Sequence, residues 1–512
     1  MAGASLPRYA DFVVVGAGPG GCAAAAELAR SGSASVLVLE AGPDYGPHDS
    51  GRWPAELLEA FDLAETHGWG YDSASSYGSR VVSFSRARVV GGCSAHNGCA
   101  AIWGHRLDYD GWAAAGNDGW STDVLLPFFR EANEAMRVAI PGPAHITPFH
   151  QLMLESAAAA GIPLVADLND LDEPIGMAPS PANIWNGIRW NAAFAFLDPI
   201  RNQANVRIIG DALVDTIQFH DGRVAGVTVV RDGTREFVGA GTVALAGGTY
   251  NSPAVLLRSG VGPADQLHAL GIDVVADLPG VGQNLHDHPA VYLVHAGSET
   301  LKGQMASWAE THFLPEEQTI AKLRSSRCSE AFDLHIYPES GPYAEGRTTW
   351  DFTIPVACMT PKARGALRIR STDPTVPPVL DHNYLGDPDG HDQAVLVEGI
   401  GIAREIARNA NRYGLLGEEL EPGPSIAGDH AVAGWVSDNV HHYFHAAGTC
   451  AMGPDNDRAA VVTQRGAVRD VEGLFVADCS VMPVVPRANT NIPAVVVGMR
   501  IGRWLAGTDT HQ

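Results

Sequence analysis

The sequence predicts an α/β protein in which a Rossmann-like, dinucleotide-binding domain packs against a second domain. Two observations predict this fold class. The chain has 512 residues, more than one hydrophobic core usually holds, so two closely packed domains are expected. Its N-terminal region has the pattern of a buried strand, a glycine-rich turn, a helix and a second strand, which is how a Rossmann-like domain begins.

Each part of this N-terminal pattern is present. Residues 11–15 form a short run rich in valine, typical of a buried strand. The sequence GAGPGG follows at 16–21, and an alanine-rich segment at 22–30 is expected to be helical. A second strand is expected at 35–39. The glycine motif therefore stands in the strand–turn–helix context that dinucleotide binding requires.

Each residue of the motif has a physical role. Gly16 permits a tight turn, Gly18 lets the backbone approach a pyrophosphate, and Gly21 lets the helix pack closely on the strand. Glu40 ends the second strand, where its carboxylate can accept the ribose hydroxyl protons, and Ala41 follows it in the same site. NAD and FAD both fit the motif, and its place near the N-terminus favours FAD.

Composition narrows the function classes and the compartment. The formal net charge of -24 argues against binding to nucleic acid or to anionic membranes. The acidity indicates either a solvated surface or a field that attracts a cationic substrate. Seven scattered cysteines, an odd number, favour a reducing cytoplasm. We expect no signal peptide and no membrane-spanning segment, because no apolar stretch is long enough.

A second glycine-rich segment, at residues 85–112, is the most specific part of the chain. Gly91 and Gly92 are followed by small and polar residues and then by Asn97 and Gly98. Such a segment leaves backbone N–H groups free to face a ligand and has few side chains to block its approach. We therefore expect these four residues to contact the cofactor.

This segment resembles the first signature of the glucose–methanol–choline (GMC) oxidoreductases, and residues 248–262 resemble the second. The resemblance implies FAD as cofactor and a second domain built on an antiparallel sheet. His96 occupies the position at which some members bind the flavin covalently through its ring methyl group. The alternative for His96 is a hydrogen-bonded residue in a crowded turn.

The same resemblance assigns further residues to the cofactor site. Val214 matches the position that holds the adenine by main-chain contacts, and Asp478 matches a residue that contacts the flavin side chain. Ala246, beside the second signature, and Ile492, in the C-terminal motif, are also assigned to FAD binding.

Catalysis is assigned to two residues near the C-terminus. Oxidation of an alcohol removes a hydride from carbon and a proton from oxygen, and histidine suits the proton transfer near neutral pH. His445 matches the catalytic histidine of the family, although Ala446 replaces the proline that often follows it. Asn491 matches the second polar position over the flavin. The alternatives are a core histidine for His445 and a helix cap for Asn491.

Two other segments contain histidines. His286, Asp287 and His288 resemble metal ligands, but no further ligand stands at a recognisable spacing, and no metal is expected. A strand expected at residues 332–337 makes His335 and Tyr337 candidates for the substrate pocket. The sequence identifies no aromatic cage or carboxylate for a quaternary ammonium group.

The resemblance also divides the chain. Residues 1–290 correspond to the N-terminal GMC module and 355–505 to the C-terminal module, while 291–439 mainly form the substrate-binding domain. The FAD domain is expected to be discontinuous, with segments at about 1–112, 195–290 and 440–512.

The function expected from these features is oxidation of a small polar primary alcohol to an aldehyde, with dioxygen as acceptor and hydrogen peroxide as product. His96 favours this oxidase interpretation, because covalent flavins are commoner in oxidases. The alternatives are a dehydrogenase that uses a quinone or another carrier, and a lyase similar to the hydroxynitrile lyases, in which flavin has no redox role. We expect the enzyme to be cytoplasmic, and a homodimer is compatible with the sequence.

Overall fold

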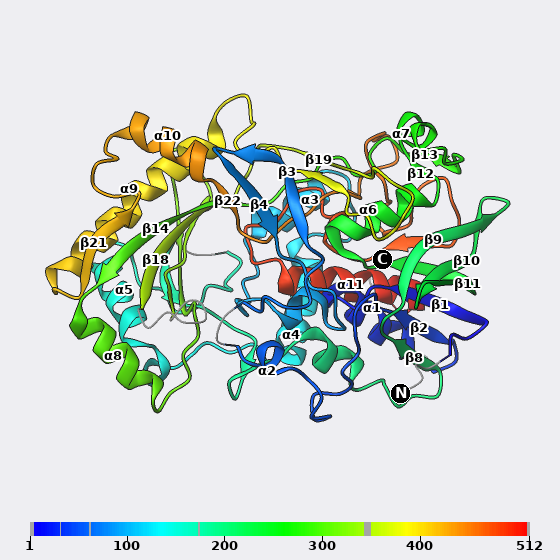
Figure 1. Cartoon of the computed structure of the whole chain (residues 1–512), viewed down its shortest axis with the longest axis horizontal. Coiled ribbons are helices and arrows are strands. Elements are labelled where there is room, and N and C mark those ends of the chain that lie inside the picture. The colour runs from blue at the N-terminus through cyan, green and yellow to red at the C-terminus, as the bar shows by residue number, and fades with distance from the viewer. Residues whose placement is uncertain (1–4, 31, 61–62, 173–174, 342–349, 509–512) are drawn as a thin grey trace.

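The computed structural model describes residues 5–508, except 31, 61–62, 173–174 and 342–349. Figure 1 shows two regions side by side, each built around its own sheet. Helix α11 (Asn491–Ala506), near the C-terminus, lies next to the N-terminal strands. Most buried apolar residues of both regions belong to one continuous core. No described helix is both long and apolar enough to cross a bilayer.

The first sheet has the Rossmann-like arrangement that the sequence predicts. Its strand order is β8-β2-β1-β11-β10-β9, and β23 pairs with β11. Strands β8, β2, β1, β11 and β23 pair in parallel, and their central members are almost fully buried because helices and loops cover both faces. The strands are β1 (Tyr9–Val15), β2 (Val36–Leu39), β8 (Val206–Ile209), β9 (Leu213–His220), β10 (Arg223–Arg231), β11 (Thr234–Leu245) and β23 (Leu474–Val476).

Helix α1 (Pro19–Ala29) packs against α11, and the small residues of both helices determine how close they come. A Cβ atom on Gly498 would lie 2.1 Å from the carbonyl oxygen of Gly20, and one on Gly502 would lie 2.9 Å from the Cα of Ala24. Backbone contact of this kind fixes the position of α11 along α1. The N-terminus of α11, which carries Asn491, is thereby placed beside the glycine-rich turn.

The second sheet is antiparallel, as the resemblance implies. Its order is β21-β14-β18-β16-β15-β5, with β17 and β22 paired to β18 and β14. The strands are β5 (Gly176–Pro179), β14 (Pro289–Gly297), β15 (Thr319–Leu323), β16 (Leu334–Ile336), β17 (Glu339–Gly341), β18 (Asp351–Cys358), β21 (Leu416–Glu421) and β22 (His441–His442).

Helix α9 (His391–Arg412) covers one face of this sheet. A Cβ on its Gly399 would meet the side chains of Leu334 and Val356, so these two side chains point toward the helix. Because side chains alternate along a strand, Tyr292 and Tyr337 point to the opposite face. That face borders a cavity, and both tyrosines line it.

The remaining elements surround these two regions. A four-stranded sheet is formed by β19 (Ala366–Arg368), β20 (Val379–Asp381), β3 (Tyr71–Tyr77) and β4 (Arg80–Phe84). Short strand pairs are β6 (Ile184–Trp185) with β7 (Ile188–Arg189) and β12 (Val261–Gly262) with β13 (Ala276–Asp277). The other helices are α2 (Ala55–Leu58), α3 (Arg106–Ala114), α4 (Thr122–Ala135), α5 (Pro148–Ala159), α6 (Gly248–Arg258), α7 (Ala264–Ala269), α8 (Glu299–Ala309) and α10 (Asp429–Asn439).

Candidate active site

One continuous cavity borders both the Rossmann-like sheet and the antiparallel sheet. Most of the residues that the sequence assigns to cofactor binding and catalysis line this cavity, although they come from distant parts of the chain. They are Gly16, Gly18, Glu40, Ala41, Gly92, His96, Asn97, Gly98, Val214, Ala246, His445, Asp478 and Asn491.

The glycine-rich turn forms one end of the cavity. Gly16 has a φ of 100°, a backbone conformation that glycine adopts easily, and its N–H donates to the carbonyl of Leu39 over 2.8 Å. The carboxylate of Glu40 accepts hydrogen bonds from the backbone N–H groups of Ala17 and Gly42, each at 2.9 Å. These hydrogen bonds hold the carboxylate at the end of β2. Burial raises the pKa of Glu40 to about 7.

Gly21, Gly91 and Ile492 lie behind the cavity wall and are not among the residues that line it. A Cβ on Gly21 would lie 2.0 Å from the carbonyl oxygen of Gly16, so this glycine allows α1 to approach the turn. Gly91 has a φ of 101° and donates its N–H to the carbonyl of Ala17 over 2.7 Å. Ile492 is fully buried in the core. These three residues shape the wall indirectly.

The second glycine-rich segment lies directly against the first. A Cβ on Gly92 would come within 2.6 Å of the Cα of Gly18, so the two backbones cross in contact. His96, four residues later, is buried, and its Nδ1 has no hydrogen-bond partner within the described part of the chain. Burial, helped by the nearby charge of Arg189, lowers the pKa of His96 to about 3, so the imidazole is neutral.

These features fit an FAD molecule. Close backbone crossing at Gly18 and Gly92 leaves a cradle without side chains, which suits a pyrophosphate. Asp478 is fixed beside it, because its Oδ2 accepts from the N–H of Gly248 at 2.8 Å and from the hydroxyl of Ser252 at 2.5 Å. His96 lines the same cavity, and its buried Nδ1 has no hydrogen-bond partner among the described residues.

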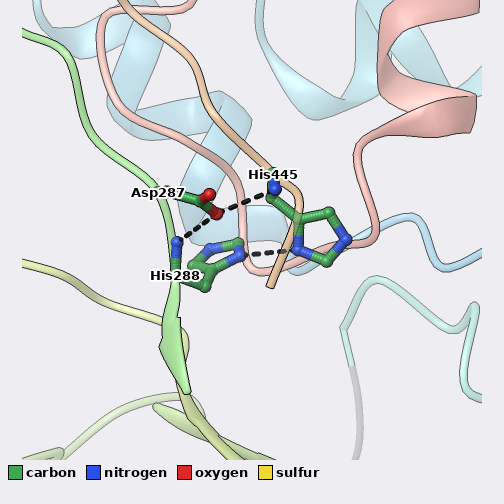
Figure 2. A group of neighbouring side chains, drawn as sticks. All are labelled: Asp287, His288 and His445. Atoms are coloured by element: carbon green, nitrogen blue, oxygen red, sulfur yellow. Dashed lines mark hydrogen bonds between the residues drawn. The ribbon is translucent and has the colours of Figure 1, made fainter. Parts of the chain in front are cut away.

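His445 lines the cavity and belongs to a hydrogen-bonded cluster with Asp287 and His288, which is drawn in Figure 2. The Oδ1 atom of Asp287 accepts from the backbone N–H of His288 at 2.7 Å and from that of His445 at 2.8 Å. Its Oδ2 accepts from the hydroxyl of Tyr384 at 3.2 Å. The Nδ1 atoms of His288 and His445 face one another at 3.0 Å. Asp287 thus connects the loop that precedes β14 to the segment that carries His445.

Both histidines of this cluster are neutral. Burial is the main cause that lowers the pKa of His288 to about 3 and that of His445 well below its usual value. A neutral imidazole has one nitrogen with a proton and one without, so a single proton lies between the facing Nδ1 atoms. His445 also lines the cavity. A ring nitrogen that is not engaged by His288 is therefore available there.

Asn491 is the first residue of α11, directly after the cap residue Thr490. Its Nδ2 lies 3.4 Å from Oδ1 of Asn183, while its buried Oδ1 has no hydrogen-bond partner among the described residues. The alternative of a helix cap is therefore not supported. Asn491 instead lines the same cavity as His445.

Asp287, His288 and His445 place their ligand atoms within 4.8 Å of one another, a spacing that a metal ion could use. Sequence reasoning missed this third ligand because 157 positions separate His288 from His445. Hydrogen bonds within the cluster already engage Oδ1 of Asp287 and both facing Nδ1 atoms, so the arrangement is explained without a metal. The same spacing occurs at Cys358, His391 and Asp392. There, Asp392 accepts backbone N–H groups, and burial raises the pKa of the thiol.

Beyond His445, the cavity is lined by tyrosine and glutamate side chains that the sequence alone does not bring together. The rings of Tyr337 and Tyr443 stack with centroids 4.0 Å apart, and Tyr292 lies across Tyr337. Glu317 borders the same space. Of the two strand candidates, Tyr337 lines the cavity, whereas His335 is fully buried behind it and stacks on Phe332.

Glu317 has an unusual environment for an acidic residue. Its Oε1 is inaccessible to solvent and has no hydrogen-bond partner in the part of the chain that the structure describes. Burial, and then the neighbouring charge of Glu316, raise the pKa of Glu317 to about 8. Sequence reasoning found neither a cage nor a carboxylate here, because the tyrosines and the glutamate belong to different strands and loops.

Comparison with known proteins agrees with this geometry. The GMC oxidoreductase family profiles match residues 10–290 and 361–498. An oxygen-dependent choline dehydrogenase from Brucella anthropi is 33% identical, over 97% of this chain and 96% of that protein. One from Rhizobium johnstonii is 31% identical with the same coverage.

Solved structures share the fold at lower identity. Pyridoxine 4-oxidase from Mesorbium loti superposes with a TM-score of 0.85 at 24% identity, over 97% of this chain and 99% of that chain. A formate oxidase gives a TM-score of 0.86 at 22% identity, over 98% and 99% of the two chains. With matching profiles over most of its length and relatives above 30% identity, the chain belongs to the GMC oxidoreductases, FAD-dependent enzymes that act on CH–OH donors.

Proposed function

We propose that this enzyme oxidises a small polar primary alcohol to an aldehyde and passes the electrons to dioxygen, which forms hydrogen peroxide. Bound FAD supplies the hydride acceptor, N5 of its flavin ring. The observation that carries the proposal is His445, a neutral, buried imidazole at the wall of the cofactor cavity. Such a group can accept the hydroxyl proton of the alcohol while the hydride leaves its carbon.

Asn491 is proposed to hold the alcohol oxygen. Its amide lines the cavity and has an unpartnered oxygen, so it has hydrogen-bonding capacity left for a substrate. A fixed polar group near the reacting oxygen stabilises the charge that develops as the proton leaves. His445 and Asn491 together are therefore proposed as the catalytic pair.

We propose the remaining predicted residues as the FAD site. Their place along the cavity wall supports this role for most of them, and Gly21, Gly91 and Ile492 would act from behind the wall. The residues that would face the cofactor are Gly16, Gly18, Glu40, Ala41, Gly92, His96, Asn97, Gly98, Val214, Ala246 and Asp478.

The division into an FAD domain and a substrate domain is also proposed. The strands of the Rossmann-like sheet come from residues 9–39, 206–245 and 474–476, all within the expected FAD segments. The antiparallel sheet draws most of its strands from 289–421. It also takes β22 from the segment expected in the FAD domain, so the boundary near residue 440 is best moved beyond β22.

The similar choline dehydrogenases are named as oxygen-dependent, which supports dioxygen as the electron acceptor. The alternatives are a dehydrogenase that reduces a quinone or another carrier, and a lyase in which flavin is not reduced. A buried, neutral histidine beside the cavity supplies the base that alcohol oxidation requires.

The substrate end of the cavity supports a cationic alcohol. Stacked tyrosine faces attract cations through their ring quadrupoles, and a buried carboxyl such as Glu317 gains a counterion when a cation binds. The similar proteins are named for choline, a quaternary ammonium alcohol. The net charge of -24 acts in the same direction. We therefore propose amino alcohols as the substrate class.

Anaerobic reduction of the flavin by a panel of primary alcohols tests the function directly. Choline and other amino alcohols should bleach the visible absorption faster than the uncharged analogue of choline, in which a tert-butyl group replaces the trimethylammonium group. Admission of air should restore the colour promptly with formation of peroxide. Slow recovery would indicate a dehydrogenase. Bleaching by none of the alcohols would favour the lyase.

Replacement of His445 by Ala should lower the rate of anaerobic flavin reduction by about 10²–10⁴-fold, because the base is lost. The FAD content should stay near that of the wild type, since the glycine segments remain. His430→Ala, an exposed histidine on α10, is the control and should leave the rate unchanged. Near-normal reduction by the His445 variant would remove this residue from the mechanism.

Covalent attachment of FAD through His96 is proposed from its buried, neutral imidazole and unpartnered Nδ1. Precipitation of the enzyme with acid should leave the yellow colour in the pellet. His96→Ala should release all of its flavin into the supernatant while still binding FAD before precipitation. A colourless wild-type pellet would contradict the covalent bond.

The raised pKa of Glu317 predicts a pH-dependent effect on stability. The unfolded chain loses this proton near pH 4.5, whereas the folded enzyme without substrate keeps it to about pH 8. The contribution of Glu317 to stability is therefore full below pH 4.5 and falls as the pH rises to about 8. The melting temperature of Glu317→Gln should rise relative to that of the wild type as the pH increases across this interval.

Glu310→Gln, at the exposed end of α8, is the matched control for thermal unfolding and should show no such trend. A constant difference between wild type and Glu317→Gln from acid to alkaline pH would show that Glu317 ionises normally.

A further inference from the structure

We propose that His288 is a positioning residue that fixes the tautomer of His445, so that Nε2 of His445 is left without a proton and faces the substrate. The inference rests on the proposed role of His445 as the base. It adds a function for the loop that resembled a metal motif in the sequence. In Figure 2, the rings of the two histidines meet through Nδ1, and Nε2 of His445 points away from His288.

The distance between the rings restricts the possible protonation states. At 3.0 Å, the two Nδ1 atoms form a hydrogen bond in which one nitrogen donates and the other accepts. If His288 donated, His445 would carry its proton on Nε2 and could not accept one from an alcohol there. If His445 donates, its Nε2 is unprotonated and able to act as a base. The tautomer of His288 therefore decides between an inactive and an active His445.

The surroundings of His288 favour the second arrangement. Its ring is fully buried, and the backbone carbonyl groups of Met359 and Pro486 raise its pKa, as acceptors near a ring N–H do. Because Nδ1 of His288 faces His445 at 3.0 Å, Nε2 is the ring nitrogen left to carry the proton, although it makes no full hydrogen bond among the described residues. With its own proton on Nε2, His288 presents an unprotonated Nδ1 as the acceptor for His445.

The backbone around the pair holds this geometry. Asp287 receives the N–H groups of both histidines on one oxygen, so the two residues cannot separate without breaking hydrogen bonds to a buried carboxylate. His286 anchors the same loop from the other side. Its Nδ1 donates to the carbonyl of Asn284 at 2.6 Å, and its Nε2 accepts from the N–H of Val485 at 2.8 Å.

His288 differs from the carboxylate that orients histidine in hydrolytic triads. A neutral acceptor fixes the tautomer without adding a negative charge, and burial keeps His288 neutral by lowering its pKa to about 3. When the alcohol proton reaches Nε2 of His445, the Nδ1–H remains bonded to His288, so the imidazolium keeps an acceptor. The groups whose charges lower the pKa values of the pair are Arg86, His286, His335, His442 and Arg487.

Two substitutions separate positioning from packing. His288→Asn keeps an oxygen near the place of Nδ1 that can accept from His445, whereas His288→Leu has a similar volume and no acceptor. We expect His288→Leu to lower the rate of anaerobic flavin reduction by about 100-fold, since His445 loses its fixed tautomer. We expect His288→Asn to stay within about tenfold of the wild type, because its amide accepts as the imidazole does. Both should retain FAD and a normal melting temperature.

A direct measurement covers the case in which His288→Leu does not fold. Nitrogen-15 NMR of the histidine-labelled wild-type holoenzyme, with the His445 signals identified by their loss in His445→Ala, should show a protonated Nδ1 and an unprotonated Nε2. A protonated Nε2 would overturn the proposal, as would equal rates for folded His288→Leu and wild type. If His445→Ala itself keeps its activity, the proposed function fails instead, so the two failures are distinguishable.

Discussion

The carboxylate of Asp287 holds the active-site end of the molecule together. One of its oxygens accepts the backbone N–H groups of His288 and His445, which belong to segments 157 positions apart in the chain. Because the carboxylate is buried, loss of either hydrogen bond would leave a polar group without compensation. This constraint brings the loop before the antiparallel sheet against the C-terminal segment that carries His445. The rings of the two histidines meet because both backbones donate hydrogen bonds to this carboxylate.

The cofactor end depends on a different constraint, the close contact of backbone with backbone. Gly18 and Gly92 touch where the two glycine-rich segments cross, and Gly20 and Gly498 touch where α1 meets α11. Side chains at these positions would separate the segments, so the shape of the cradle follows from residues without a Cβ. The contact between α1 and α11 also sets the position of Asn491. The glycine-lined cradle and Asn491 are therefore parts of one packed unit.

Burial sets the protonation state of the titratable groups along the cavity. The histidines are kept neutral by desolvation, which suits an acceptor of protons, and Glu317 is kept protonated by the same physical cause. A cation that entered between Tyr337, Tyr443 and Glu317 would favour release of the glutamate proton. Substrate binding and ionisation of Glu317 would then be coupled, which gives the tyrosine-lined end a preference that a purely apolar pocket would lack.

The sequence by itself determined the family, the Rossmann-like beginning of the fold and FAD as cofactor, because these depend on contiguous signals: a strand, a glycine turn and a helix, or a signature of adjacent residues. It also named His445 and Asn491 as candidates through their motifs. Only the tertiary structure decided that His288 faces His445 and that Glu317 lies among tyrosines. Those contacts join residues from separate strands and loops, and the spacing along the chain does not encode which distant segments a fold brings together.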